Sequence, residues 1–290
     1  APDGEVFRQL GALGLMGALA PVEAGGSQIG VAELAVAIEE LATVDASTAL
    51  LLAHHNAALL MLGADADLEE LCAGKLALLV DAQHDVEAHE RDGRSTLQGA
   101  AALVPGAMHA AAVYVVARTP QGSALFRCDH DPERAAVLTH GLDACGFGDV
   151  RFAAVTASKV RGGDSFEADA HKSRTAREAL VAACAVGLAR GSLTDALNYA
   201  NERQQFGKPL AAFQAIQFKL ADMATAVDGS RLLVQAAATG DRTAMRHARR
   251  HASAQALFVC DEAVQIHGGY GYTREYAVEG RLRDARYFLT

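Results

Sequence analysis

Two short segments of the chain contain the residues best suited to chemistry. Residues 201–210 read Asn-Glu-Arg-Gln-Gln-Phe-Gly-Lys-Pro-Leu, and residues 265–272 read Gln-Ile-His-Gly-Gly-Tyr-Gly-Tyr. Each segment follows a long Ala- and Leu-rich stretch with helical spacing, so we expect each at the end of a helix. Glycines allow the backbone to approach a ligand closely, and the guanidinium of Arg203 suits a phosphate. Together the segments predict a split site for the pyrophosphate of a dinucleotide.

Composition limits the classes of protein that need to be considered. The chain has 290 residues, of which 51% are hydrophobic, so it can bury a sizeable core in one large domain or two smaller ones. Its 26 Lys and Arg residues against 35 Asp and Glu residues give a formal charge of -9. This balance argues against nucleic acid as the main partner. The short basic cluster of Arg246, Arg249 and Arg250 is interpreted as a solvated helix face.

Cysteines, histidines and apolar runs exclude several kinds of site. The five cysteines lie far apart without a Cys-x-x-Cys pair, which argues against structural zinc or a disulfide framework and fits a reduced, cytoplasmic setting. His247 and His251 share a helix face but stand among arginines, so we predict no metal site. The apolar run 49–62 is shorter than the ~20 residues that a membrane span needs, and the sequence shows no charged-then-apolar leader. We therefore expect no membrane span.

Hydrophobic periodicity divides the chain into three parts. In residues 1–75, apolar side chains recur at helical spacing, as with Leu34 and Ile38. Residues 76–170 consist of short β-branched and apolar runs between turn residues, a pattern typical of a small sandwich or barrel. Helical spacing returns in residues 171–290 and predicts a helix bundle. The expected fold is mostly α, with a small central β domain.

The central part has five candidate strands. The predicted strands are 76–81, 95–103, 112–118, 124–128 and 150–155. Turn residues at 92–93, 119–122 and 146–148 separate them.

Several motifs resemble the acyl-CoA dehydrogenase family in order and spacing. They are Glu-Arg-Gln-Gln-Phe-Gly-Lys-Pro-Leu at 202–210, Phe-Gln-Ala-Ile-Gln at 213–217, Leu-Ala-Asp-Met at 220–223, the 265–272 segment and Arg-Asp-Ala-Arg at 283–286. Residues 7–10, Pro21 with Gly25-Gly26, and 38–41 resemble the family's opening helices and loop. The middle of the chain departs from the family, because the Thr-Glu-Pro, Gly-Ser-Asp and aromatic-Ile-Thr-Asn segments are missing.

This resemblance implies a fold, a cofactor and a reaction. The fold is a helical N-terminal domain, a middle β domain and a C-terminal domain like a four-helix bundle. The reaction is α,β-dehydrogenation of an acyl-CoA thioester with hydride transfer to FAD. By resemblance, Arg203 meets the pyrophosphate, Phe206 packs on the cofactor and Gln265 closes on the adenine side. The full set of implied cofactor-binding residues is Arg203, Gln205, Phe206, Gln214, Gln265, Gly268 and Gly269. The alternative is a helix end with a surface arginine and a glycine turn, and Gln214 as a solvated side chain.

The catalytic base does not stand where the family usually has it. In most members it is a Glu in a Tyr-Glu-Gly-Thr segment after the Arg-Asp-Ala-Arg match, and this sequence ends at Thr290 before such a segment. In other members the Glu lies on the helix that leads into the Gly-Leu stretch, where Arg177 stands here, followed by Glu178. Adjacent helical positions point about 100° apart. A solvated Glu178 is therefore favoured, and Glu178 as the base is the alternative.

The family's site is shared between subunits, which suggests a specific hypothesis for this chain. It keeps the residues that reach a neighbour's FAD and lacks recognisable versions of those that hold its own flavin. It is therefore predicted to be one subunit of a heteromeric acyl-CoA dehydrogenase that completes a catalytic partner's FAD site while its own site is reduced or empty. The expected assembly is a homo- or hetero-oligomer, a dimer or tetramer, with an acyl-CoA substrate and an electron-acceptor flavoprotein as partners. One alternative is a self-sufficient dehydrogenase that uses Glu178, or a base in residues beyond Thr290. The other is a flavin monooxygenase or acyl-carrier binding protein of the same fold.

Overall fold

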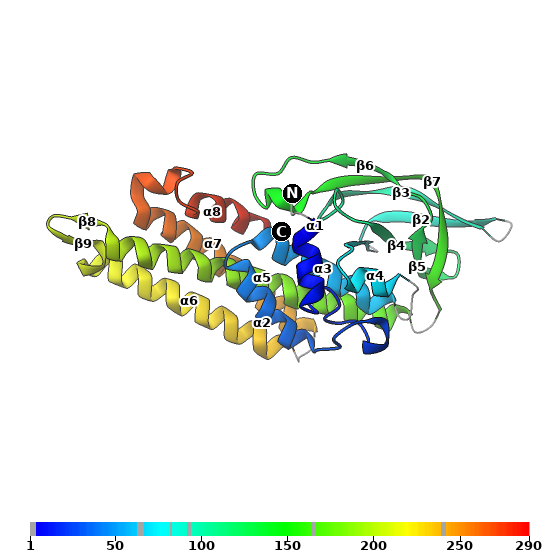
Figure 1. Ribbon diagram of the computed structural model, residues 1–290, viewed down its shortest axis with the longest axis horizontal. Coiled ribbons are helices and arrows are strands. Elements are labelled where there is room, and N and C mark those ends of the chain that lie inside the picture. Colours follow the sequence, from blue (N-terminus) through cyan, green and yellow to red (C-terminus); the bar gives the residue numbers. More distant parts are fainter. Residues whose placement is uncertain are drawn as a thin grey trace. The chain divides into compact units, whose positions relative to one another are not determined.

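The computed structural model describes residues 4–62, 67–81, 83–91, 94–163, 166–238 and 242–289. It is mostly helical with a small central β region, which confirms the predicted fold class (Figure 1). Contacts divide the chain into two compact units. Unit 1 comprises the chain up to Gly30, Leu51–Thr139 and Asp143–Arg177, and unit 2 comprises Val31–Leu50, His140–Leu142 and the chain from Glu178 onward. The three-part division by residue ranges stays a prediction.

Unit 1 contains all seven long strands. They are β1 (Ala77–Val80), β2 (Asp85–Arg91), β3 (Arg94–Val104), β4 (Ala112–Thr119), β5 (Gly122–Cys128), β6 (Glu133–Ala136) and β7 (Gly148–Arg161). The five predicted strands are present, and β2 and β6 were not predicted. Both are rich in charged residues, and β6 buries no side chain fully, so neither carries a hydrophobic pattern. The predicted turn at 92–93 lies outside the described residues.

Strand pairing in unit 1 forms a closed ring. β4 pairs with β2 and β5, β5 pairs with β7, β7 pairs with β3, and β3 pairs with β2. β1 extends this ring parallel to β4, and β6 pairs with the start of β7. Phe126, Phe152 and Leu97 fill the interior. Of the two predicted arrangements, a barrel describes this pairing better than a sandwich, because closure leaves few unpaired edges.

Helices of unit 1 cover the other face of β1, β4 and β5. They are α4 (Leu68–Cys72), the larger part of α3 (Ala46–Leu62) and the first turns of α5 (Phe166–Glu202). Unit 1 also contains α1 (Gly4–Ala12) and the short 3-10 turns η1 (Val22–Ala24) and η2 (Asp143–Cys145). Their apolar side chains pack with Tyr114, Val116 and Leu125 of the sheet. His55 of α3 is fully buried, and its Nδ1 accepts a hydrogen bond from the backbone N–H of Ala77 at 3.0 Å. This bond ties α3 to the first residue of β1.

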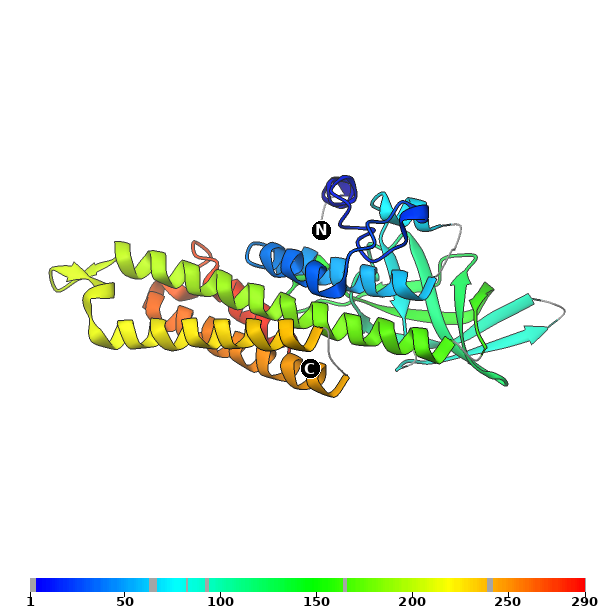
Figure 2. The same cartoon turned by 90° about the horizontal axis from the view of Figure 1, so that it is seen from below.

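Unit 2 is a bundle of long helices. Its elements are α2 (Val31–Ala42), the rest of α5, α6 (Gln214–Ala238), α7 (Arg242–His267) and α8 (Val278–Tyr287), with the hairpin β8 (Gln204–Gln205) and β9 (Lys208–Pro209) and the 3-10 turns η3 (Leu210–Ala212) and η4 (Gly268–Tyr272). In two views, α5, α6 and α7 run side by side with the β8–β9 hairpin at one end (Figures 1 and 2). α6 buries Leu220, Met223, Val227 and Val234 at helical spacing.

α2 lies directly against the backbone of α5. A Cβ atom at Gly187 would lie 2.2 Å from the carbonyl oxygen of Glu39, and one at Gly191 would lie 2.5 Å from that of Thr43. Residues four apart lie on one face of a helix, so the two glycines form a smooth strip that admits α2. No side chain fits at these positions without moving α2.

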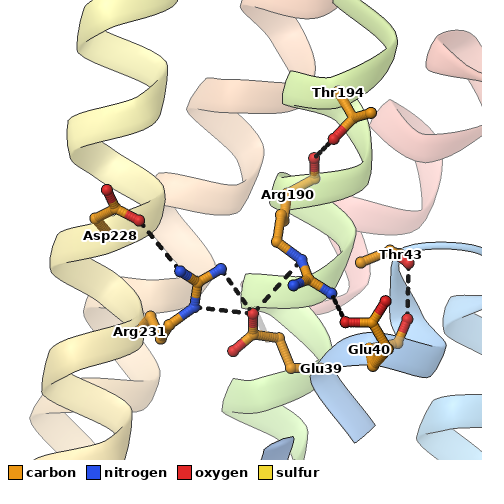
Figure 3. Close-up of polar contacts among 7 residues, drawn as sticks. All are labelled: Glu39, Glu40, Thr43, Arg190, Thr194, Asp228 and Arg231. Carbon is orange, nitrogen blue, oxygen red and sulfur yellow. Dashed lines mark hydrogen bonds and ion pairs between the residues drawn. The ribbon is translucent and has the colours of Figure 1, made fainter. Parts of the chain in front are cut away.

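A charge network joins α2 and α5 to α6 (Figure 3). Glu39 on α2 is buried, and its side chain is only 11% exposed. Its Oε1 accepts hydrogen bonds from Nε and Nη2 of Arg231 on α6, both at 2.9 Å, and lies 3.6 Å from Nε of Arg190 on α5. Arg231 also pairs with Asp228, and Arg190 with Glu40. Every charge in this network therefore has a partner, as a buried ion pair requires.

α5 is long and apolar enough to cross a membrane by length and composition alone. However, 72% of its most apolar window is buried within the protein, which is typical of the core helix of a globular fold.

Candidate functional site

The first predicted segment forms a tight hairpin directly after α5. The helix ends at Glu202, and Gln204 pairs with Pro209 and Gln205 with Lys208. The two turn residues have positive φ, 52° at Phe206 and 77° at Gly207. Two-residue hairpin turns with positive φ at both positions suit glycine and asparagine, whereas a bulky side chain there is strained. The hairpin therefore holds Phe206 in a conformation that its own residue type does not favour.

This turn presents an aromatic ring to the outside. Phe206 is 93% exposed. Its ring meets that of Phe213 edge-on, with centroids 6.3 Å apart, and Nζ of Lys208 lies 4.2 Å from the Phe213 centroid. Gln205 and Gln214 are exposed beside these rings. A strained, exposed phenylalanine is a reason to look for a ligand or partner that covers it.

Arg203 joins the hairpin to the second predicted segment. Its guanidinium carbon lies 5.2 Å from the ring centroid of Tyr270 in η4, which follows α7 directly. Among the described residues, Arg203 has no carboxylate partner. The structure thus brings the two segments together, as the split-site prediction required, and leaves the cation free to meet an anion.

A cluster of aromatic rings fixes the two helix ends beneath this contact. Tyr199 stacks on His267 with centroids 4.2 Å apart, and Tyr276 meets both rings edge-on. His267 is buried, and its Nδ1 lies 2.7 Å from the carbonyl oxygen of Ala263, to which it donates as an N–H. Burial raises the pKa of the Tyr199 phenol. These rings hold Arg203 and η4 in place without occupying the outer surface.

The glycine turn is open on its outer side. Gln265, Gly268 and Gly269 are exposed. A Cβ atom at Gly268 or Gly269 would meet no described atom within 4 Å. Gly268 has a φ of 58°, which favours glycine, but packing does not require one at either position. The free guanidinium, accessible backbone and exposed ring together fit the pyrophosphate and the flat surfaces of a dinucleotide.

Arg177 stands at the helix position where some members of the family carry their base, and it forms an ion pair. Nη2 of Arg177 lies 2.6 Å from Oδ2 of Asp81, at the end of β1, and the side chains are 19% and 6% exposed. Both residues belong to unit 1. His84 lies beside the pair, and its pKa is lowered by burial, raised by Asp81 and lowered by Arg177, with a net decrease. An arginine locked onto an aspartate does not accept a proton from a substrate.

Glu178 is half-buried, so its side chain is only partly solvated. In unit 2 it lines a cavity of about 790 Å³ together with Arg246, Arg250 and Ser253 of α7 and Phe288 after α8. Its Oε2 is buried and has no hydrogen-bond partner among the residues that the structure describes. Of the basic cluster on α7, Arg246 and Arg250 are exposed and Arg249 is half-buried, so the predicted solvated face holds for the first two. Sequence reasoning missed this cavity, although Thr243, Arg246, His247, Arg250 and Ala254 share one helix face by spacing.

Comparison with known proteins decides the family. A model of the acyl-CoA dehydrogenase N-terminal domain matches residues 1–73, and one of the C-terminal domain matches residues 175–289. Cyclohex-1-ene-1-carbonyl-CoA dehydrogenase of Geobacter metallireducens is 33% identical over 312 residues, covering 94% of this chain and 82% of that protein. The chain belongs to the acyl-CoA dehydrogenase family. The resemblance inferred from the motifs is therefore confirmed.

Two further relatives extend this result. Butyryl-CoA dehydrogenase from Megasphaera elsdenii superimposes with a TM-score of 0.88 at 30% identity, covering 99% of this chain and 85% of that one. The caffeyl-CoA reductase-Etf complex subunit CarC of Acetobacterium woodii is 47% identical over 114 residues, 37% of this chain. That match spans only 30% of the relative's length. Acyl-CoA dehydrogenases are an oxidoreductase family of flavoproteins, which implies FAD as the cofactor.

Proposed function

We propose that this chain acts in the α,β-dehydrogenation of an acyl-CoA thioester as the subunit that contributes binding residues to an FAD shared with a neighbouring subunit. The observation that carries the proposal is the hairpin after α5. It holds Phe206 93% exposed at a strained φ, and the nearby Arg203 has no carboxylate partner among the described residues. A molecule that lies against this end of the chain would cover the exposed ring and pair with the guanidinium, and so accounts for both features.

Each residue of the hairpin end has a role in this proposal. Arg203, held by Tyr270, binds the pyrophosphate, where a guanidinium makes charge-assisted hydrogen bonds. Phe206 covers an apolar surface of the cofactor and excludes water from it. The backbone at Gly268 and Gly269 approaches the adenine side, where no side chain obstructs it. FAD, when bound, accepts the hydride from the β-carbon of the substrate.

The base is proposed to come from the partner subunit. Arg177 holds Asp81 in a buried ion pair, so neither side chain is available to remove the substrate's α-proton. This favours a heteromeric enzyme, in which the two chains have different tasks. An electron-acceptor flavoprotein completes the set of partners, in line with a relative named as a subunit of an Etf complex. The five free, buried cysteines suit the proposed reducing, cytoplasmic setting.

Flavin counting after co-expression tests this proposal. We expect this chain to bind little FAD alone and to form an active complex with a second acyl-CoA dehydrogenase-family chain from the same genome, with fewer than one FAD per chain. In that complex, Arg203→Gln should lower the retention of FAD about 10-fold or more, because the substitution removes a charge-assisted contact. Lys172→Gln, at a side chain that is 75% exposed, is the matched control and should change nothing. A homo-oligomer that holds one FAD per chain and oxidises an acyl-CoA would contradict the proposal.

One observation favours a self-sufficient enzyme as the second candidate. The carboxylate of Glu178 has a buried oxygen with no partner among the described residues, as a poised base would have. Glu178→Gln separates the candidates, because it removes the base and keeps the size of the side chain. Unchanged turnover in this variant would eliminate Glu178, and a loss of about 100-fold or more with unchanged substrate affinity would support it.

A further inference from the structure

One end of the β-barrel in unit 1 contains a polar cavity of about 640 Å³. This volume lies within the roughly 300–1,000 Å³ of small-molecule sites. Its walls come from the end of β2, the start of β3, the later part of β7 and the residues after β5, and its polar wall residues include Glu90, Arg94, Ser95, Asp129, Ser158 and Lys159. All of them lie between the segments that the family models match, residues 1–73 and 175–289. The cavity is therefore formed by the middle of this chain.

A row of small side chains closes the barrel core at this end. In the strand register, Ser95 of β3 lies opposite Ala157 of β7, and Ala157 lies opposite Cys128 of β5. All three residues are buried. Two residues further into β5, the ring of Phe126 fills the core. Because the last row is small, this end of the barrel is hollow, and the mouth of a barrel is a common place for a ligand.

Ser95 is a buried polar residue of this cavity. It lines the cavity although it is only 8% exposed. Its hydroxyl makes no hydrogen bond to any residue that the structure describes. Ser158 differs, because its Oγ donates to Oδ1 of Asp129 at 2.8 Å. Buried hydroxyl groups are normally hydrogen-bonded, so Ser95 points to a molecule in the cavity that accepts a hydrogen bond.

Charges of both signs surround the cavity. Nζ of Lys159 lies 4.0 Å from Oε1 of Glu90, and the two side chains are 43% and 54% exposed. This separation is longer than the roughly 3.2 Å limit of a good hydrogen bond, so both groups keep their hydrogen-bonding capacity. Arg94 forms no ion pair in the part of the chain that the structure describes. Donors and acceptors are therefore available to a ligand that carries both an anion and a cation.

We propose that this cavity binds a zwitterionic α-amino acid with a polar side chain. Its ammonium group donates to the carboxylate of Glu90, and its carboxylate accepts from Lys159 and from the hydroxyl of Ser95. The two charged groups of an α-amino acid share one carbon atom, so they match a carboxylate and an ammonium that lie 4.0 Å apart. Polar walls suit a polar side chain. These residues belong to unit 1 and the proposed cofactor contacts to unit 2, so either assignment stands without the other.

Calorimetric titration of the intact chain with L-serine, L-asparagine and L-glutamine tests the site. We expect at least one of them to bind, and acetate and ethylamine, which carry one charge each, to bind at least about 10-fold more weakly. Glu90→Gln and Lys159→Gln should each weaken binding about 10-fold, because each removes a charge-assisted hydrogen bond. Glu23→Gln and Lys172→Gln are the matched controls, since both residues are exposed and lie outside the cavity.

Several results of this titration would overturn the assignment. One is the absence of binding by all three amino acids at concentrations up to about 10 mM. Another is binding that survives both cavity variants or that is lost in either control. Acetate that binds as tightly as the amino acid would show a plain anion site, and ethylamine that does so would show a plain cation site.

Ser95→Ala provides a second readout. The change should weaken binding of the amino acid about 3-fold to 10-fold, because it removes a hydrogen bond to the ligand. It should leave the melting temperature of the ligand-free protein unchanged or higher, because the hydroxyl has no partner within the described chain to lose. A variant that melts lower, or that binds the amino acid as tightly as the parent, would contradict the ligand role of Ser95.

Discussion

The Glu39 network and the cavity beside Glu178 are built from the same residue types and have opposite characters. At Glu39, one buried carboxylate contacts two arginines, and each of these has a further acidic partner. At Glu178, a carboxylate with a buried oxygen forms no ion pair with Arg246 or Arg250 in the described part of the chain. The two clusters therefore differ in how many of their described charges have an ion-pair partner, and complete pairing is found where the cluster joins helices. Changes at the two places should accordingly act on different properties.

Glu39→Ala should produce the largest loss of stability. It leaves Arg190 and Arg231 without their shared buried acceptor, and removing one partner of a buried pair costs about 3–5 kcal/mol. Urea unfolding of the variant measures the loss. Glu40→Ala is the matched control, because Glu40 pairs with Arg190 but its side chain is 74% exposed, and exposed pairs contribute about 1 kcal/mol or less. Equal losses in the two variants would remove the distinction between them.

The buried His55 should make stability fall in acid. Burial lowers its pKa from 6.5 to about 4, an effect that the backbone carbonyl groups of Met16 and Leu71 partly offset. The unfolded chain therefore binds a proton below pH 6.5 that the folded chain does not bind until about pH 4. The free energy of unfolding should drop by up to about 3 kcal/mol as the pH falls through this window.

Chemical unfolding at a series of pH values measures this dependence. His55→Gln is less stable overall but lacks the titrating group, so its stability should depend less steeply on pH between 6.5 and 4. His89→Gln, at a side chain that is 62% exposed, is the control. A slope that persists unchanged in His55→Gln would assign the acid sensitivity to other groups.

Gly187→Ala tests whether the Glu39 network depends on close backbone packing. The added Cβ would lie 2.2 Å from the carbonyl oxygen of Glu39, so α2 must move away from α5. Overpacking of this kind costs about 1–3 kcal/mol. Gly229→Ala on α6 is the control, because its Cβ would meet no described atom within 4 Å. That control should be neutral or slightly stabilising, since alanine favours helices by about 1 kcal/mol over glycine.

Glu178→Gln should have the smallest effect on stability. Its carboxylate makes no ion pair in the described structure, so neutralising it should shift the free energy of unfolding by about 0.5 kcal/mol or less. The same urea titration used for Glu39→Ala measures it. A loss as large as that of Glu39→Ala would show that Glu178 belongs to a structural network, and the contrast between the two regions would disappear.

The sequence predicted the parts of the fold that rest on local patterns. Five strands and the ends of α5 and α7 were expected from hydrophobic period and glycine turns, and the structure has them. β2 was missed because its residues Asp-Val-Glu-Ala-His-Glu-Arg bury only Val86 and Ala88 fully among the side chains described. Its place in the sheet depends on pairing with β3 and β4, which a single segment does not reveal.

The residues of the candidate sites also fall into two groups, those that a local motif predicts and those whose contacts depend on distant parts of the chain. Arg203, Phe206 and the glycine turn were found because their motif is contiguous, and their approach to one another follows from two helices that end together. The Arg177–Asp81 pair joins residues far apart in the chain, and no local pattern distinguishes it from two solvated charges. The half-burial of Glu178 likewise depends on the position of α7. Ion pairs and burial arise only in the folded chain. The sequence therefore shows where these charged residues stand in the chain but not which residues they contact.

The hairpin at Phe206 also has a spectroscopic use. The chain contains no tryptophan, so a Phe206→Trp variant would carry a single indole at a tip that is 93% exposed. In the free subunit such an indole is expected to emit as a fully hydrated fluorophore. Contact with a flavin would quench it, and contact with protein alone would only shift its emission. The fluorescence of this one side chain would then show when the tip becomes covered, and whether a flavin or protein alone covers it.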